Sequence, residues 1–159
     1  FLGEGEAIYE KQVLKLVEEF PRRVACHIGY SEEMAHQIIA SSDMLVVPSR
    51  FEPCGLTQIY AMRYGTLPIV HFTGGLADTV IDADDDEDGI GTGFVFDHYD
   101  RADLWETMGR ASQLYRKHRR WRPMMVNAMQ QQFSWDESAH DYENTYYRAL
   151  GERGLLDKK

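Results

Sequence analysis

Cysteine, proline, long hydrophobic runs and basic residues are all scarce in this sequence. The 159 residues include two cysteines, Cys26 and Cys54, and five prolines. Two cysteines are far below the density of a disulfide-stabilised scaffold, which favours a reducing compartment. No apolar run approaches the roughly 20 residues that cross a bilayer, and no signal peptide is visible. We therefore expect no association with a membrane.

The shortage of basic residues leaves the chain strongly acidic. Lys and Arg number 17 and Asp and Glu number 26, which gives a formal net charge of −9. Nucleic acids and anionic membranes both attract Lys and Arg, so non-specific binding to either is disfavoured. Hydrophobic residues make up 43% and charged residues 27%, as in an ordinary globular chain with a buried core. This composition excludes a wholly disordered chain.

The sequence also lacks a recognisable metal site. Its six histidines show no metal-ligand spacing. The acidic run at 84–88 could attract a divalent cation, but it lacks the glycine and carboxylate spacing of an EF-hand loop, which favours a solvated loop. The basic cluster at 116–122 falls near a predicted helix C-terminus, where cations suit the helix dipole. We predict no metal and no cofactor.

Short apolar runs alternate with amphipathic stretches along most of the chain. The pattern predicts buried strands at 24–28 and 44–48, further strands at 67–72 and 93–96, and helices at 6–19, 32–41, 55–64, 76–80, 100–118, 121–132 and from 135 onward. Ser134 and Glu137 have the spacing of a capping box. Such alternation predicts an α/β fold with an open, mostly parallel sheet and helices on both faces. We expect one domain at 1–132, followed by a C-terminal helix and frayed tail at 133–159.

Ligands of open α/β sheets bind beyond the carboxyl ends of the strands, where three loops are predicted here. The loop that contains Glu52 runs into a predicted helix, so the N–H groups of Gly55, Leu56 and Thr57 are expected to be unpaired at its N-terminus. The helix dipole favours a phosphate there, and the Thr57 hydroxyl adds a donor. Glu52 would lie within reach of the group attached to that phosphate. An ordinary strand-to-helix turn with an exposed Glu is an equally good interpretation of these residues alone.

The other two loops carry weaker signals. Gly74 and Gly75 could let a sugar or phosphate approach the main chain, although a tight turn is the commoner use of two glycines. Tyr30 could stack on a flat base, although a half-buried aromatic at a strand end is more frequent. Cys54 stands at a helix N-terminus, where a packed or ligand-contacting thiol is more common than a reactive one. His71 is the histidine nearest to these loops in the sequence.

Three strings in this region resemble bacterial glycogen synthases and plant starch synthases. They are PSRFEPCGLTQ at 48–58, AMRYG at 61–65 and TGGLADTV at 73–80, and the resemblance extends from Leu2 to Asp136. It implies the GT-B fold, in which two Rossmann-like domains face a cleft, with this chain as the C-terminal, nucleotide-sugar-binding half. It also implies transfer of glucose from ADP-glucose to the non-reducing end of an α-1,4-glucan, with retention of the anomeric configuration. The implied location is the bacterial cytoplasm, or the plastid stroma of a plant or alga.

The resemblance also assigns roles to individual residues. Glu52 matches the family's essential carboxylate in the glucosyl subsite and is the predicted catalytic residue. The predicted substrate-binding residues are Cys54 and Gly55 along the glucose, Leu56 and Thr57 at the diphosphate, Tyr30 stacked on adenine, and Gly74 and Gly75 in the glycine turn near the donor.

Departures from the pattern of retaining transferases narrow the predicted family and the share of the active site that this chain supplies. Related retaining transferases often carry a second Glu eight positions after the first, and Tyr60 stands there, which favours the glycogen and starch synthases. The family's phosphate-neutralising Arg and Lys, and its N-terminal domain with a Lys-Gly-Gly loop, have no counterpart here. The chain begins at Phe1 rather than Met, so we expect a piece of a longer enzyme that carries about half of an active site. Its expected partners are ADP-glucose or ADP, an α-1,4-glucan and the N-terminal domain of the same protein.

Two alternatives stay open at this point. The first is a related retaining GT-B transferase that uses another nucleotide sugar or another acceptor. The second is a non-catalytic nucleotide- or glucan-binding domain that stands alone.

Overall fold

The computed structural model describes residues 1–84 and 91–153, apart from the side chain at 137. Most of the acidic run at 84–88 therefore lies outside the described residues. Contacts divide the chain into two units, Phe1–Met129 and Gln130–Lys159. The second unit contains one long helix, α7 (Trp135–Glu152). No helix in the described residues is long and apolar enough to span a bilayer.

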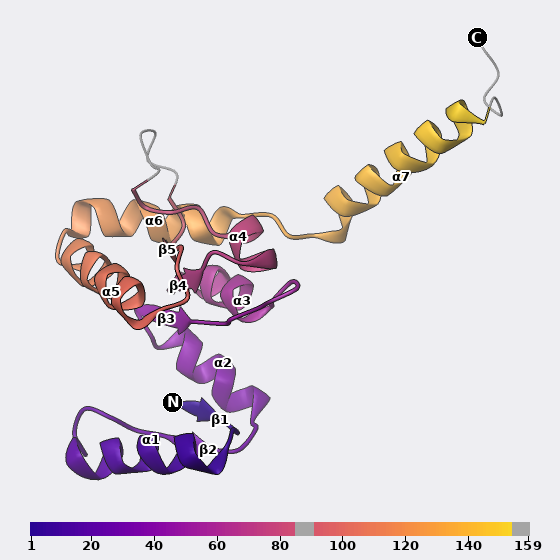
Figure 1. The fold of residues 1–159 in the computed structure, drawn as a ribbon. Coiled ribbons are helices and arrows are strands. Elements are labelled where there is room, and N and C mark those ends of the chain that lie inside the picture. The colour runs from indigo at the N-terminus through magenta and orange to yellow at the C-terminus, as the bar shows by residue number, and fades with distance from the viewer. Residues whose placement is uncertain (85–90, 154–159) are drawn as a thin grey trace. The chain divides into compact units, whose positions relative to one another are not determined.

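The first unit begins with a small parallel sheet (Figure 1). Strands β1 (Leu2–Gly3) and β2 (His27–Ile28) pair in parallel, and helix α1 (Ala7–Glu19) connects them. The prediction of a buried strand at 24–28 is wrong in length and in burial. Only His27 and Ile28 join the strand, because β1 offers just two residues for pairing, and both are exposed.

A three-stranded parallel sheet forms the centre of the unit. Strands β3 (Met44–Val47), β4 (Leu67–His71) and β5 (Phe94–Phe96) lie in the order β3-β4-β5. Every residue of the central strand β4 is buried, which is consistent with the apolar run at 67–70 that precedes His71. Val47 pairs with Val70, and His71 pairs with Phe96, so the carboxyl ends of the three strands meet at one edge. The predicted open parallel sheet is confirmed.

Helices cover both faces of this sheet. In Figure 1, α3 (Thr57–Tyr64) and α4 (Gly74–Thr79) lie on one side of the strands and α5 (Arg101–Tyr115) on the other. Helix α2 (Glu32–Ala40) packs against α3, and α6 (His118–Gln130) follows α5.

Side-chain caps are observed at the starts of two helices. Ser31 Oγ accepts a hydrogen bond from the Met34 amide at 3.2 Å and so caps α2. Asp100 caps α5, and the bond from the Asp103 amide is the main reason that the pKa of its carboxyl is lowered. Ser134 precedes α7 as predicted, but its side chain makes no capping hydrogen bond, so its half of the capping box is not formed. The Glu137 side chain lies outside the described part.

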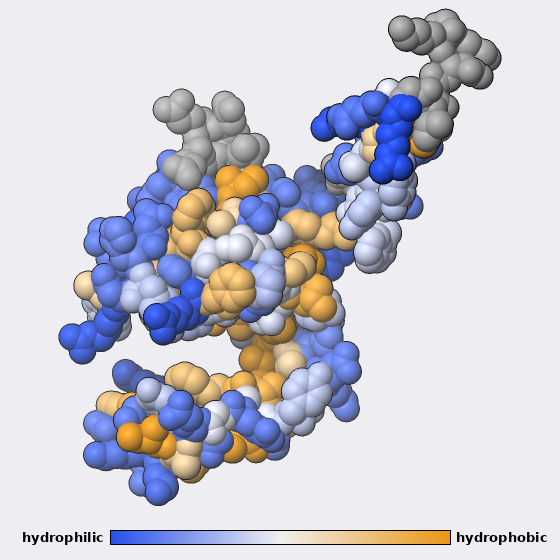
Figure 2. All heavy atoms as spheres, turned by 45° about the vertical axis from the view of Figure 1, so that its right-hand side comes forward, coloured by the Kyte–Doolittle hydropathy of each residue, from blue (hydrophilic) through white to orange (hydrophobic). Residues whose placement is uncertain are grey.

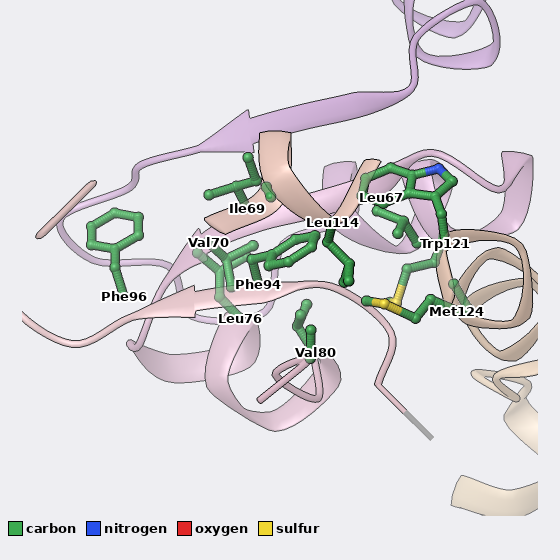
Figure 3. Close-up of a cluster of buried hydrophobic side chains, with 14 residues drawn as sticks. Leu67, Ile69, Val70, Leu76, Val80, Phe94, Phe96, Leu114, Trp121 and Met124 are labelled. Carbon is green, nitrogen blue, oxygen red and sulfur yellow. The ribbon is translucent and has the colours of Figure 1, made fainter. Parts of the chain in front are cut away.

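The hydrophobic core joins the central sheet to the helices around it (Figure 3). Phe94 of β5 stacks on Trp121 of α6, with ring centroids 6.0 Å apart. The fully buried members at the centre come from β4, α4 and β5, namely Leu67, Ile69, Val70, Leu76 and Phe94. Val70 lies near the end of β4 and Leu76 lies in the first turn of α4, so this core anchors both sides of the connection between them.

Helix α1 is amphipathic, but its apolar residues are not covered. Ile8 is 60% exposed and Leu14 is 45% exposed, and no residue of α1 is buried. Figure 2 shows the resulting hydrophobic patches among hydrophilic residues on the surface of the segment that carries α1. The periodicity thus predicts the helix correctly, while the described residues leave its apolar face exposed.

An ion-pair cluster ties the segment after α4 to β5 and α5. Arg110 donates to Asp82 Oδ1 at 3.0 Å and to Asp84, and its second nitrogen donates to the Val95 carbonyl at 3.0 Å. Asp82 is nearly buried and also accepts from the Val95 amide at 2.5 Å. Burial acts to lower the pKa of Arg110, but the bonds and charges of Asp82 and Asp84 outweigh it and raise that pKa. The guanidinium therefore stays charged at any working pH.

We expect Arg110→Met to lower the free energy of unfolding by about 2 kcal/mol, because the nearly buried Asp82 carboxylate loses its counter-charge. Denaturant unfolding would measure the loss. Arg101→Met is a suitable control, since Arg101 is exposed on the same helix and should change stability by under about 0.5 kcal/mol. Equal stability of the two variants would contradict a structural role for the cluster.

Candidate functional site

The candidate site lies where β3 and β4 end. The loop at 48–56 connects β3 to α3. Phe72 and Thr73 connect β4 to α4, which begins with the glycine pair Gly74 and Gly75. The carboxyl ends of adjacent parallel strands place their loops side by side. The structure joins them directly, because the Gly75 amide donates to the Glu52 carbonyl at 3.0 Å.

Gly74 and Gly75 allow this contact because neither has a side chain. A Cβ on Gly74 would lie 2.1 Å from the Glu52 carbonyl oxygen, and one on Gly75 would lie 2.1 Å from the Cys54 carbonyl oxygen. Gly74 also has φ +45°, a conformation that favours glycine. The demonstrated reason for the glycine pair is therefore the close approach of two protein main chains. Approach of a ligand to the same turn remains a prediction.

The Glu52 side chain is half-buried and accepts a hydrogen bond from a residue of its own loop. Ser49 Oγ donates to Glu52 Oε2 at 3.4 Å, and His71 Nδ1 lies 3.0 Å from the Ser49 carbonyl. The carbonyl can only accept, so this contact assigns the proton of the neutral imidazole to Nδ1. His71 is buried and packs its ring against Phe96 and Tyr99, with centroids 5.3 and 5.2 Å away. A rigid histidine at the end of β4 thus orients the loop that carries the carboxylate.

Helix α3 begins at Thr57, two residues later than predicted. Gly55 has φ +72°, which is incompatible with a right-handed helix, and Leu56 is the N-cap without a side-chain capping bond. The first amides of a helix have no partner within it. Leu56 and Thr57 are both exposed, so their amides stand at an accessible, positively polarised helix start. Gly55 precedes this start and connects it to Cys54, which is exposed with a free thiol.

Gln58 is a site residue that the sequence reasoning missed. Its side chain is fully buried, and its Nε2 lies 3.0 Å from the carbonyl oxygens of both Cys54 and Gly55. The spacing of apolar residues in the sequence could have indicated that Gln58 is buried. Ala61 and Met62 follow three and four residues later and are also fully buried, so Gln58 stands on the inward face of α3.

Tyr30 is the one predicted site residue that is not brought into this cluster. It follows β2 and is 83% exposed, so the alternative of a half-buried aromatic is wrong. Within the described residues, no interaction joins Tyr30 to the Glu52 loop or to the glycine pair. Its role against a base stays a prediction.

Metal ligands are not grouped in the part of the chain that the structure describes. It holds no set of three or more His, Cys, Asp or Glu side chains arranged to bind an ion. The groups at this edge of the sheet include the Glu52 carboxylate, the amides at the start of α3 and the Thr57 hydroxyl. Such a set can bind an anionic phosphate at the helix start and stabilise a positive charge near the carboxylate.

The chain is similar to several known proteins. The family model described as "Glycosyl transferases group 1" matches residues 2–124. A glycogen synthase of Francisella tularensis subsp. novicida (strain U112) is 47% identical over 153 residues, which are 95% of this chain and 31% of the relative. The chain thus spans about a third of the length of the curated relatives it matches.

Two solved structures extend the likeness to the fold. The catalytic domain of starch synthase IV from Arabidopsis thaliana, solved with ADP and acarbose, matches with a TM-score of 0.79 and 34% identity over 95% of this chain and 32% of that one. A sucrose-phosphate synthase from Thermosynechococcus elongatus matches with a TM-score of 0.63 and 25% identity over 95% of this chain and 38% of that one. The fold matches the C-terminal part of GT-B glycosyltransferases.

Proposed function

The chain belongs to the group 1 glycosyl transferases, and from this membership we propose that it is the donor-binding domain of a glucan synthase. The complete enzyme transfers glucose from ADP-glucose to the non-reducing end of an α-1,4-glucan, with retention of the anomeric configuration. The likeness to a glycogen synthase and to a starch synthase solved with ADP supports this choice of donor and acceptor.

One observation carries the proposal. A main-chain hydrogen bond joins the Glu52 loop to the glycine pair at the carboxyl edge of the sheet. The Gly75 amide reaches the Glu52 carbonyl at 3.0 Å, and the start of α3 opens beside them. A single ligand with a diphosphate and a sugar could therefore meet a carboxylate and free helix amides at the same time.

Each predicted residue has a physical task in this proposal. The amides of Leu56 and Thr57 bind the diphosphate, and they act more strongly as the leaving phosphate gains charge. Cys54 and Gly55 line the glucose, and Glu52 stabilises the positive charge that develops on the anomeric carbon. Gly74 and Gly75 complete the donor side of the site, and the Tyr30 ring stacks on adenine.

The remaining parts of the active site are proposed to lie outside these 159 residues. A diphosphate donor conflicts with a net charge of −9 unless cationic side chains come from elsewhere. We place those cations and the second wall of the cleft in an N-terminal domain of the same protein. We likewise propose the unit boundary near 132, with the C-terminal helix beyond it, and a cytoplasmic or plastid location.

A donor assay on the complete protein tests the proposal. We expect glucosyl transfer to glycogen with ADP-glucose, with kcat/KM at least ten times that for UDP-glucose. A reversed preference would favour a related retaining transferase, an alternative that the likeness to a sucrose-phosphate synthase keeps relevant. Absence of transfer from every nucleotide sugar, with ADP still bound, would favour a non-catalytic binding domain.

A further inference from the structure

Gln58 is a polar side chain placed where the fold normally puts a hydrophobic one. It is fully buried on the inward face of α3, beside Ala61 and Met62. Burial of an amide costs free energy unless its hydrogen bonds are replaced, so such a residue needs a specific set of partners.

Those partners fix the direction of the amide. The Gln58 Nε2 lies 3.0 Å from the Cys54 and Gly55 carbonyl oxygens and 3.2 Å from Thr79 Oγ1. Thr79 Oγ1 gives its own proton to the Gly75 carbonyl at 2.6 Å, so it can only accept from Gln58. Three acceptors therefore surround Nε2, and the reversed amide would place an oxygen against all of them.

The fixed amide closes a ring of contacts around the site. From Gln58 the ring runs through Thr79 to Gly75, from the Gly75 amide to the Glu52 carbonyl, and back along the chain through Cys54. The Gln58 side chain thereby links the loop that carries the carboxylate to the helix that carries the glycine pair. Along the sequence, α3 and β4 lie between these two segments.

The stability of the folded state does not by itself account for a glutamine at position 58. The Gln58 Oε1 is buried and accepts no hydrogen bond from the described residues, which is unfavourable for folding. Its presence also restricts Gly55, because a Cβ there would lie 2.5 Å from Oε1. A hydrophobic side chain of similar size would avoid the unpaired oxygen but would leave two loop carbonyls without their donor.

We propose that Gln58 is a positioning residue, which holds the Glu52 loop and the Gly74–Gly75 turn in the arrangement that glucosyl transfer requires. It acts through the main chain at Cys54 and Gly55 and through Thr79, and touches no substrate itself. This inference rests on the proposed function for its kinetic consequence. Its structural consequence, a link between the two loops, does not depend on that function.

The test compares Gln58→Met with Thr66→Val in the complete protein. Methionine keeps the length and shape of Gln58 but removes the donor. Thr66 is a matched control, because it is also buried and its hydroxyl bonds two carbonyls, those of Ile39 and Ser42, away from the site loops. We expect Gln58→Met to lower kcat about 30-fold while the KM for ADP-glucose changes less than three-fold. Thr66→Val should keep kcat within two-fold of the wild type.

Two further readouts separate positioning from loss of stability. Hydrogen exchange in the peptide that contains Gly75 should be at least ten-fold faster in Gln58→Met, and unchanged in Thr66→Val. A double variant, Gln58→Met with Thr79→Val, should lose no more than about twice as much kcat as the more impaired single variant, because both residues belong to one link.

Several results would contradict the proposed role of Gln58. Unchanged exchange at Gly75 with unchanged kcat in Gln58→Met would overturn the proposal, as would equal kcat losses in Gln58→Met and Thr66→Val. A wild-type protein that transfers no sugar would refute the proposed function and the kinetic half of this inference. The exchange result would then decide by itself whether Gln58 links the two loops.

Discussion

Replacing Glu52 with alanine in the complete enzyme is expected to lower kcat about 1,000-fold, with a much smaller change in the KM for ADP-glucose. As the bond between glucose and phosphate breaks, the anomeric carbon gains positive charge, and a preorganised carboxylate stabilises that charge. An interaction that strengthens only in the transition state affects kcat rather than donor binding. The structure supplies the preorganisation, because Ser49 Oγ bonds the carboxylate and Gly75 holds the main chain of the same residue.

Steady-state assays of glucose incorporation into glycogen would measure the effect. Glu106→Gln is the control for loss of one negative charge, since Glu106 is exposed on α5, and its kcat should stay within two-fold of the wild type. Glu52→Gln should resemble Glu52→Ala, because an uncharged amide cannot replace the carboxylate. Turnover of Glu52→Ala within a few-fold of the wild type would refute the assignment of Glu52 as the catalytic residue.

The periodicity of hydrophobic residues predicted the central part of the fold. The apolar run at 67–72 is a local signal that the structure confirms, since β4 forms at Leu67–His71. The convergence of two loops also followed from the sequence, because parallel strands place their carboxyl ends at one edge. The location of the candidate site was therefore predictable before its contacts were known.

Burial was less predictable, because it depends on what covers an element. The run at 24–28 has the apolar character of a buried strand, yet β1 offers only two residues for pairing. Helix α1 has an apolar stripe that the described residues leave exposed, as Ile8 illustrates. Local sequence encodes the apolar stripe, whereas its burial depends on tertiary contacts, which the local pattern does not encode.

The contacts within the site were the least predictable. The glycine pair was interpreted as an approach for a ligand or as a tight turn, whereas the structure shows it making room for the carbonyls of Glu52 and Cys54. Gln58 was not among the site residues predicted from the sequence. Both features are tertiary, since each depends on the distance between two loops that are separated in sequence.

This packing predicts that two glycine-to-alanine substitutions change the free energy of unfolding in opposite directions. Gly75→Ala is expected to lower the free energy of unfolding by about 3 kcal/mol, because its Cβ would lie 2.1 Å from the oxygen, and 2.5 Å from the Cα, of Cys54. Both atoms belong to the main chain, so relief requires the two loops to separate. Separation would break the bond from the Gly75 amide to the Glu52 carbonyl, and we expect kcat to fall at least 100-fold.

Gly109→Ala is the matched control and should have the opposite sign. Gly109 lies inside α5, and an added Cβ there has no neighbour within 4 Å. Alanine loses less backbone entropy than glycine on folding, so this variant should gain roughly 0.5–1 kcal/mol and keep its kcat. Denaturant unfolding and glucosyl transfer of both variants provide the measurements. If Gly75→Ala matched Gly109→Ala in both, the Glu52 loop could not lie against the glycine pair, and the site would have to be rebuilt around a wider separation of the two loops.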